Sequence, residues 1–180
     1  MNIILLSGKA ESGKTTSALF IKEELINKGF AQNRILHTNY AGALKFICKS
    51  FFGWNGEKNE SGRRLLQEIG TDVVRKKDPD FWVKFMLSIL QMFERYWDYV
   101  IIDDVRFENE IEIMKNSFDS VVTIKVKRDN YENHLTEEQR QHPSETALDN
   151  YEFDYVVSNS GDIKFKQVIS NVINDIINKN

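Results

Sequence analysis

The chain has 180 residues, enough for one domain that buries roughly 70% of the surface its unfolded chain would expose. With 41% hydrophobic and 28% charged residues, 2 prolines and 9 glycines, its composition excludes a disordered or collagen-like chain. The 24 Lys and Arg against 27 Asp and Glu give a formal charge of -3, which excludes a basic surface for binding DNA or RNA regardless of sequence. The single Cys48 lies among apolar residues, so we expect a buried, unreactive thiol.

The N-terminal segment predicts a strand, a loop and a helix in succession. Residues 2–6 are a short apolar run that ends at a glycine-rich turn. Apolar residues then recur at helical spacing between 15 and 28, and Gly29 ends the pattern. The apolar start is too short for a signal peptide or a membrane span, so we expect a cytoplasmic protein without a membrane partner.

The middle of the chain is predicted to be largely helical. A strand at 34–39 precedes helices at 41–52, 61–76 and 81–97, with Asp80 as the predicted N-cap of the last helix. The apolar residues of that helix are expected to form one broad stripe: Trp82, Phe85, Met86, Ile89, Leu90, Phe93, Tyr96 and Trp97.

The C-terminal half alternates strands with helices. Residues 99–103 are a continuous apolar run, the pattern of a parallel strand covered on both faces. The remaining elements are predicted as a helix at 108–116, strands at 121–126 and 154–158, a polar stretch at 128–143, a helix from about 144 and a final helix at 162–178. Five strands alternating with helices predict a three-layer α/β domain with a five-stranded parallel sheet, whose ligands bind beyond the carboxyl ends of the strands.

The turn after the first strand matches the phosphate-binding P-loop pattern GxxxxGK[ST]. Its glycines let backbone N–H groups wrap phosphate oxygens, and the following helix adds the positive end of its dipole. Lys14 supplies a positive charge, and the Thr15 hydroxyl offers a ligand to Mg²⁺. We therefore expect a nucleoside triphosphate with Mg²⁺ to bind at Gly8, Lys9, Ala10, Glu11, Ser12, Gly13, Lys14, Thr15 and Thr16.

Two acidic residues, Asp103 and Asp104, end the apolar strand, where P-loop proteins hold the acid that orients Mg²⁺. Adjacent strand residues point to opposite faces, so only one of the two can face the metal, and the sequence leaves open which. A solvated strand end and the acid pair of a hydrolytic ATPase are the alternative interpretations.

Arg106 and Arg128 each follow a strand end and are candidates for neutralising charge on a transferred phosphoryl group, although either could pair with a surface carboxylate. The stretch 129–142 is interpreted as a mobile cover that excludes water, with a plain solvated loop as the alternative. His134 and His142 have no Cys or carboxylate partner at metal-binding spacing, so we expect no zinc site.

Four groups of residues resemble the phage-type deoxynucleoside monophosphate kinases in order and spacing. They are Leu65-Leu66-Gln67 through Gly70-Thr71 to Arg75; Phe81-Trp82-Val83; Asp104-Val105-Arg106-Phe107-Glu108-Asn109-Glu110; and His142-Pro143-Ser144-Glu145. The resemblance implies transfer of a phosphoryl group from ATP to a dNMP, giving ADP and dNDP. It implies one P-loop kinase domain over 1–180, with a core of 1–40, 98–127 and 144–180, a helical monophosphate-binding insertion of 41–97 and a lid of 128–143.

The resemblance also assigns site residues. It implies acceptor contacts at Lys45, Arg64, Gln67, Arg75, Trp82, Arg106, His142 and Glu145, catalytic roles for Lys14, Asp104, Arg106 and Arg128, and an adenine contact at Asn159. Trp82 fits a buried core stripe equally well, Arg64 could be solvated, and Ser144 and Glu145 could cap a helix. The family often has a small hydroxyl residue at the position of Asp103, and the lid here carries only Arg128 and Arg140 as arginines.

The expected partners are therefore ATP, Mg²⁺ and a deoxynucleoside monophosphate, in a host cytoplasm if the chain is phage-encoded. A different phosphorylated acceptor, of the phosphomevalonate or dephospho-coenzyme A type, is an alternative within the same architecture. An NTP-driven switch or hydrolase is the alternative from another class. The base, the sugar and the oligomeric state stay open, with a homodimer as one candidate assembly.

Overall fold

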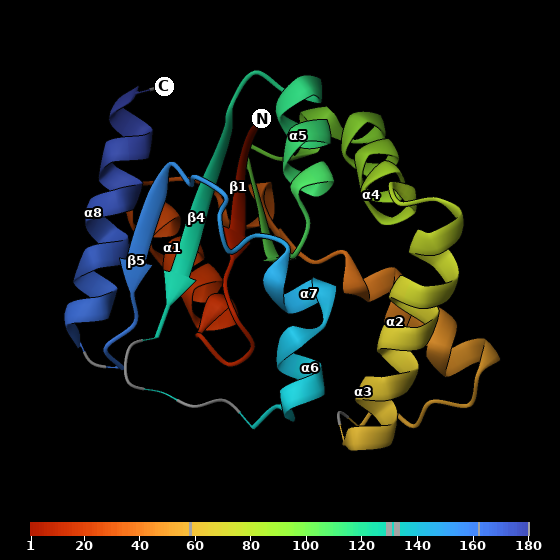
Figure 1. Ribbon diagram of the computed structural model, residues 1–180. Helices are drawn as coiled ribbons and strands as arrows, with labels where there is room; N and C mark the ends of the chain where they lie inside the picture. The colour runs from red at the N-terminus through yellow and green to blue at the C-terminus, as the bar shows by residue number, and fades with distance from the viewer. Residues whose placement is uncertain (58, 129–130, 132–133, 162, 180) are drawn as a thin grey trace.

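A five-stranded sheet forms the centre of the protein, in a computed structural model that describes residues 1–57, 59–128, 131, 134–161 and 163–179. Residues 129, 130, 132 and 133 of the predicted lid lie outside the described residues. The sheet is parallel throughout, with the spatial order β2-β3-β1-β4-β5 (Figure 1). Its strands are β1 (Asn2–Ser7), β2 (Ile35–Thr38), β3 (Tyr99–Val105), β4 (Val121–Lys127) and β5 (Tyr155–Ser158).

Helices cover both faces of the sheet, because side chains alternate between the faces along each strand. Ile4 and Leu6 of β1 pack in the core formed with α1 (Lys14–Asn27) and α8 (Ile163–Lys179). Ile3 and Leu5 pack in the core of the opposite face. The helices that contribute to that core include α2 (Ala41–Phe51), α4 (Phe81–Met92) and α5 (Glu108–Ser117). The predicted three-layer α/β fold is thus confirmed, and Cys48 is buried as expected.

The helical insertion between β2 and β3 stands to one side of the sheet (Figure 1). The helix predicted at 61–76 is an α-helix, α3 (Glu60–Gln67), that continues as a π-helical segment, η2 (Glu68–Arg75). Trp82 Nε1 donates a hydrogen bond to the carbonyl of Gly70 at 3.1 Å, which joins η2 to α4. Because π-helical turns are rare and often lie at functional sites, this segment is a candidate wall of a ligand pocket.

The predicted apolar stripe of residues 81–97 is only partly buried, which corrects the expectation. Trp82 and Leu90 are buried, but Phe85 is 48% and Phe93 is 40% exposed. The helix also ends at Met92, before a 3₁₀ turn, η3 (Glu94–Tyr96). A helix presents only one face to the sheet, so some apolar side chains of so broad a stripe must face outward.

The remaining helices are short or differ at their ends. A 3₁₀ turn, η1 (Gln32–Arg34), precedes β2. The helix predicted from about 144 is a single turn, α7 (Pro143–Thr146), and a short helix, α6 (Glu137–Gln141), precedes it. Asp80 is at the N-cap position of α4, but its side chain accepts a hydrogen bond from Asn109 Nδ2 (2.8 Å) and makes no cap. Within the described part of the chain, no helix has the length and apolar character needed to cross a membrane.

Candidate active site

The P-loop lies between β1 and α1 and is braced by the residue that follows β5. Gly13 has a φ of +99°, and a Cβ there would lie 2.1 Å from Asn159 Nδ2, so this position requires glycine. That amide nitrogen donates to the carbonyl of Ser12 (2.9 Å), and the Asn159 oxygen accepts from Gly161 N (2.9 Å). Each polar end of Asn159 thus makes one hydrogen bond with the backbone, and because Asn159 also lines the cleft, the adenine contact that the resemblance implied stays a prediction.

Lys14 is buried at the start of α1, and its amine turns back onto the P-loop. Nζ donates to the carbonyls of Gly8 and Lys9, each at 2.7 Å. Burial, together with the positive charge of Arg106, lowers the pKa of Lys14 to about 7 against the opposing effect of nearby carboxylates. The amine is thus poised to gain a proton when an anion enters the loop.

Asp103 points toward the P-loop. A hydrogen bond from Thr15 reaches its carboxyl, and His37 Nε2 lies 3.0 Å from its Oδ2. Burial raises the pKa of Asp103, but His37, Thr15 and the charge of Lys14 outweigh burial and leave the pKa below its ordinary value. The carboxyl is therefore ionised beside the Thr15 hydroxyl, so oxygen donors suited to Mg²⁺ stand together.

Asp104 has a structural environment in place of the metal or catalytic environment expected for it. Its Oδ1 and Oδ2 accept from the backbone N–H groups of Tyr40 (2.8 Å) and Ala41 (2.9 Å) at the start of α2. The strand pairing shifts between Leu5 and Ser7, whose partners are Ile102 and Val105, so β3 has one extra residue here. Side chains alternate between the faces up to this bulge, with Ile101 in the core beside α1 and Ile102 in the opposite core, and the same alternation directs Asp103 toward the P-loop and Asp104 toward α2.

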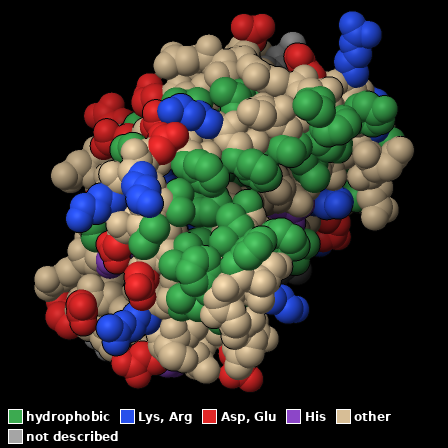
Figure 2. All heavy atoms as spheres, turned by 90° about the vertical axis from the view of Figure 1, so that its right-hand side faces the viewer, with side chains coloured by type: hydrophobic (Ala, Val, Ile, Leu, Met, Phe, Trp, Pro, Cys, Tyr) green, Lys and Arg blue, Asp and Glu red, His purple; other side chains and the backbone are tan. Residues whose placement is uncertain are grey.

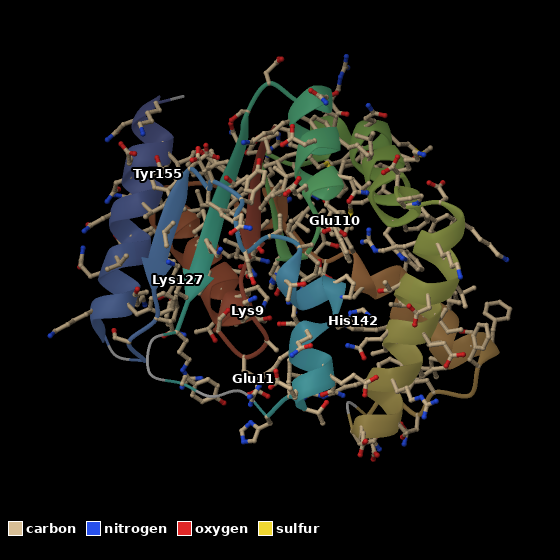
Figure 3. All side chains as sticks on the ribbon, viewed as in Figure 1. Lys9, Glu11, Glu110, Lys127, His142 and Tyr155 are labelled. Atoms are coloured by element: carbon tan, nitrogen blue, oxygen red, sulfur yellow. The ribbon has the colours of Figure 1, made fainter. Side chains whose placement is uncertain are left out.

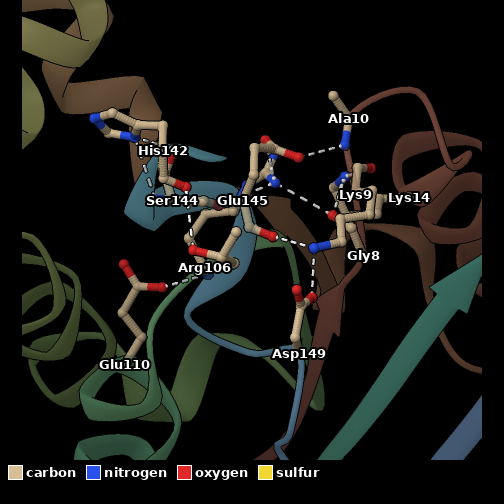
Figure 4. A network of polar contacts seen from close by, with 11 residues as sticks. Gly8, Lys9, Ala10, Lys14, Arg106, Glu110, His142, Ser144, Glu145 and Asp149 are labelled. Atoms are coloured by element: carbon tan, nitrogen blue, oxygen red, sulfur yellow. Dashed lines mark hydrogen bonds and ion pairs between the residues drawn. The ribbon is translucent and has the colours of Figure 1, made fainter. Parts of the chain in front are cut away.

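Arg106 joins the end of β3 to the P-loop and to α7 (Figure 4). Its Nη1 donates to Glu145 Oε1 at 2.7 Å and to the carbonyls of Gly8 and Ser144 at 3.3 Å. The other oxygen of Glu145 accepts from Ala10 N at 2.8 Å. One carboxylate, with 8% of its side chain exposed, thus holds both a guanidinium group and a P-loop amide.

A cleft of about 930 Å³ opens beyond the carboxyl ends of the strands. The predicted site residues that line it are Ala10, Glu11, Gly13, Lys14, Thr15, Thr16, Lys45, Gln67, Asp103, Asp104, Arg106, Arg128, Glu145 and Asn159. Arg64 is exposed and lines none of the described pockets. Arg63 lines the cleft instead, 3.8 Å from Glu11. Because Arg63 and Gln67 are one helical turn apart, this spacing was the signal that could have identified Arg63.

The sequence analysis also missed two polar residues that follow or end β2. His37 and Asn39 line the cleft, and the side-chain oxygen of Asn39 is buried without a hydrogen-bond partner among the described residues. Their only signal in the sequence was their position at a strand end, where ligands of parallel sheets bind.

A smaller pocket of about 230 Å³ lies beside the cleft, against the helical insertion, and shares Gln67, Asp104 and Arg106 with it. Trp82 lines this pocket and is also 4% exposed, so it contributes to both wall and core. The wall also includes Tyr40, Leu44, Gly70, Thr71, Arg75, Phe107 and Glu110.

Arg75 does not extend freely into this pocket. It pairs with Glu110, and its guanidinium carbon lies 4.0 Å from the centre of the Phe107 ring. Glu110 also accepts from Arg106 N at 2.7 Å (Figure 4). Burial raises the pKa of Glu110 and Arg75 opposes this rise, so the arginine compensates a buried carboxyl.

Glu11 connects the P-loop to the described residues of the predicted lid (Figure 3). Its Oε2 accepts from Tyr131 Oη (2.9 Å) and lies 3.0 Å from His134 Nδ1. These contacts lower the pKa of Glu11 to about 2. Arg128 donates to the carbonyl of Glu11 (3.3 Å) and lies over the Tyr131 ring, so the P-loop and the segment after β4 are tied together.

His142 has a helix-capping environment in place of the expected acceptor contact. Its Nδ1 accepts from Ser144 N at 3.2 Å and lies 2.9 Å from Ser144 Oγ, at the start of α7. The side chain lines none of the described pockets.

With this geometry in hand, comparison with known proteins identifies relatives. The model of a family described as deoxynucleotide monophosphate kinase matches residues 32–169. The putative deoxynucleotide monophosphate kinase of Acanthamoeba polyphaga mimivirus is 29% identical over 203 residues, covering 97% of both chains. The deoxynucleotide monophosphate kinase of Enterobacteria phage T4 is 30% identical over 113 residues, covering 61% of this chain and 44% of the phage protein.

Solved structures of two kinases have a similar fold. The APS kinase of Mycobacterium tuberculosis superimposes with a TM-score of 0.55 at 8% identity, covering 98% of this chain and 96% of that one. Thymidylate kinase from Ehrlichia chaffeensis gives a TM-score of 0.52 at 12% identity, covering 98% of each chain. At such identities the likeness concerns the fold.

Proposed function

The chain belongs to the deoxynucleotide monophosphate kinase family, and on that premise we propose that it transfers the γ-phosphoryl group of ATP to a deoxynucleoside monophosphate, giving ADP and a deoxynucleoside diphosphate. The P-loop at 8–15 precedes the matched residues 32–169, so the two lines of support come from different parts of the chain. The observation that carries the proposal is the position of Arg106, which lines both the P-loop cleft and the smaller pocket beside it.

We assign the donor to the P-loop side of the cleft. Lys14 exchanges the carbonyls of Gly8 and Lys9 for phosphate oxygens, since a charged acceptor forms a stronger hydrogen bond with an ammonium group than a neutral carbonyl does. The backbone N–H groups of the loop and the N-terminus of α1 hold the same phosphates. Arg128, at the mouth of this cleft, is assigned to charge on the donor phosphates.

Mg²⁺ is assigned to Thr15 and Asp103. The hydroxyl and the ionised carboxyl, joined by a hydrogen bond, are the hard oxygen donors that this ion prefers. Among the residues that the structure describes, no group of three His, Cys, Asp or Glu could hold a metal, which fits an ion bound partly by phosphates and water. When bound, Mg²⁺ would offset the negative charge that develops on the phosphates.

We assign the acceptor to the side of the insertion. Lys45, Arg63 and Gln67 line the cleft opposite the P-loop and are assigned to the monophosphate. The smaller pocket, with Trp82 in its wall, is assigned to the nucleoside. Arg106 then lies where the two phosphates meet and stabilises the transferred group. Because the acceptor phosphate is already an anion, positioning and charge suffice without a strong general base.

These assignments divide the chain into three parts with different roles. We propose a core of 1–40, 98–127 and 144–180, a monophosphate-binding insertion of 41–97 and a lid of 128–143. Closure of the lid would exclude water, so that the phosphoryl group passes to the acceptor and not to solvent. We place this reaction in the cytoplasm, in keeping with a substrate pair of free nucleotides.

A panel of acceptors tests the proposal. ADP release from Mg·ATP is measured with each of the four common dNMPs, the four NMPs, and no acceptor. We expect at least one dNMP to accelerate ADP release by a factor of 100 or more, roughly, over the acceptor-free rate. Equal rates with and without every nucleotide would contradict the acceptor assignment, while ATP binding would remain measurable separately by calorimetry.

We also propose that the protein is a homodimer. The outward side chains of α2 and α4 include Phe46, Phe51, Phe85 and Met92, with exposed fractions of 67%, 74%, 48% and 75%. Figure 2 shows apolar side chains gathered in a broad patch on the face to which the insertion contributes. Large apolar patches of this kind mark interaction surfaces, and a second copy offers an equally apolar partner. Light scattering at micromolar concentration should give twice the mass of the chain, and Phe85→Asp should give the monomer.

A further inference from the structure

A third pocket, of about 370 Å³, lies on the outer side of the P-loop. Four segments form it: the P-loop, Arg106 after β3, the end of β4 with the residues that follow it, and the segment that includes α7. Its lining comprises Ser7, Gly8, Lys9, Ala10, Ser12, Arg106, Lys125, Val126, Lys127, Arg128, Tyr131, Ser144, Glu145, Leu148 and Asp149. We call it the outer pocket. Neither the assigned donor nor the assigned acceptor occupies it.

Positive charge is in excess in the outer pocket. Its lining contains five cationic side chains and two carboxylates. The cations are Lys9, Arg106, Lys125, Lys127 and Arg128, and the carboxylates are Glu145 and Asp149. Lys125 and Lys127 reach it together because alternate residues of β4 share a face of the sheet, and Val126 between them packs in the opposite core. Figure 3 shows Lys9 and Lys127 on the P-loop and at the end of β4.

The two carboxylates already have cationic partners. Asp149 pairs with Lys9, and Glu145 pairs with Arg106 (Figure 4). Lys125 donates to the carbonyls of Leu148 and Asp149, at 3.1 and 3.2 Å, and its Nζ lies 5.3 Å from the centre of the Phe153 ring. Burial lowers the pKa of Lys125, Asp149 opposes this, and the charges of Lys127 and Lys9 lower it further. A pocket anion would relieve the repulsion among these lysines.

A buried hydroxyl supplies an independent sign of a ligand. Ser12 is 3% exposed, and its Oγ has no hydrogen-bond partner among the described residues. Ser12 lines the outer pocket but not the P-loop cleft. A buried hydroxyl without a partner costs free energy, and an oxygen-rich ligand in the pocket would satisfy it.

We propose that the outer pocket is a second anion site, which binds a phosphate group on the side of the P-loop opposite the donor cleft. Its cations and its hydroxyl donor fit phosphate oxygens. Its volume exceeds that of one phosphate group, so both a free polyphosphate and the phosphates of a nucleotide fit the same chemistry. The outer pocket shares Arg106 and Arg128 with the donor cleft, but Lys125, Lys127 and Ser12 line it and do not line that cleft, so the two sites can be tested separately.

Calorimetry with pyrophosphate tests this site. The protein is first saturated with Mg·AMP-PNP and a dNMP, so that the donor and acceptor sites are filled, and sodium pyrophosphate is then titrated in excess Mg²⁺. We expect one further site, whose affinity falls about tenfold in Lys127→Ala, because one charge-assisted hydrogen bond is lost. Lys77→Ala removes another exposed lysine, which lines none of the described pockets, and should leave this affinity unchanged.

A second variant separates the outer pocket from the P-loop cleft. Lys14→Ala should weaken AMP-PNP binding while pyrophosphate still binds the outer pocket, and Lys127→Ala should have the reverse effect. A dTTP titration against the same saturated protein then distinguishes a nucleotide ligand from free pyrophosphate as the tighter binder. No pyrophosphate binding to the saturated protein, or binding that only Lys14→Ala removes, would overturn the proposal. An unchanged melting temperature of Lys127→Ala excludes misfolding as the cause of lost binding.

Discussion

On the donor side of the site, Lys14 rests on two P-loop carbonyls, whereas on the acceptor side Arg75 is paired with Glu110, whose side chain is 1% exposed. Arg106 stands between them, with its own glutamate partner, Glu145, at the edge of the cleft. The donor side therefore holds a lysine by neutral carbonyls, whereas the acceptor side holds an arginine by a buried carboxylate.

The difference separates groups that can move from groups that cannot. A carbonyl is a neutral acceptor, so an ammonium group can leave it for a phosphate at little cost. Removing one partner of a buried ion pair strands a charge, at a cost of roughly 3–5 kcal/mol. We infer that Lys14 responds to the nucleotide, while Arg75 and Glu110 form a fixed wall.

Replacing Lys14 should have the largest effect on activity. Lys14→Met, which keeps the bulk of the side chain without its charge, should lower kcat by about 1000-fold or more, because the charge facing the phosphates is lost. Its melting temperature should stay within a few degrees of the wild-type value, since the buried amine contributes little to the fold. Coupled-enzyme kinetics and circular dichroism measure the two quantities. A variant with near-normal turnover would contradict the donor assignment.

Replacing Glu110 should have the largest effect on stability. Glu110→Ala leaves Arg75 without its partner and the amide of Arg106 without its acceptor, so we expect a loss of about 3–5 kcal/mol in urea unfolding. Glu108→Ala, at an exposed position on the same helix, should change stability by less than about 0.5 kcal/mol. Equal effects of the two substitutions would show that the acceptor wall is not held by this pair.

The two acids at the end of β3 should separate metal binding from folding. Asp103→Asn should raise the Mg²⁺ concentration for half-maximal activity by about tenfold, because an anionic oxygen beside Thr15 is lost. Asp104→Asn should leave that concentration unchanged and cost about 1 kcal/mol of stability through weaker contacts with the amides of Tyr40 and Ala41. Magnesium titrations of both variants make the comparison. A raised Mg²⁺ requirement in Asp104→Asn but not in Asp103→Asn would assign the metal to Asp104.

The smallest expected effect is a proton taken up on binding. With the pKa of Lys14 at about 7, the amine of the free protein is mostly neutral at pH 8, and bound phosphates favour its charged form. Binding of Mg·AMP-PNP at pH 8 should therefore take up close to one proton, falling toward zero below pH 6. Calorimetry in buffers of different ionisation enthalpy counts the protons. Lys14→Met should abolish this uptake, and a persisting uptake would assign the proton to another group.

Much of the donor side could be predicted from local sequence. The strand before the P-loop, the helix after it and the ends of β3 and β4 follow from apolar patterns a few residues long. Six of the predicted P-loop residues line the cleft, namely Ala10, Glu11, Gly13, Lys14, Thr15 and Thr16, because they form one continuous turn. The resemblance to a family, carried by short motifs, was confirmed by a match over residues 32–169.

Tertiary structure decided which neighbouring side chain faces which partner. The placement of β3 in the sheet sets Asp103 toward Thr15 and Asp104 toward α2, the rotation of α3 selects Arg63 over Arg64, and Asn159 is held by the P-loop. The sequence by itself determined the elements and the phosphate loop, since hydrophobic periodicity and turn geometry are local. It did not determine these directions, because each depends on the register or packing of a segment distant in the chain.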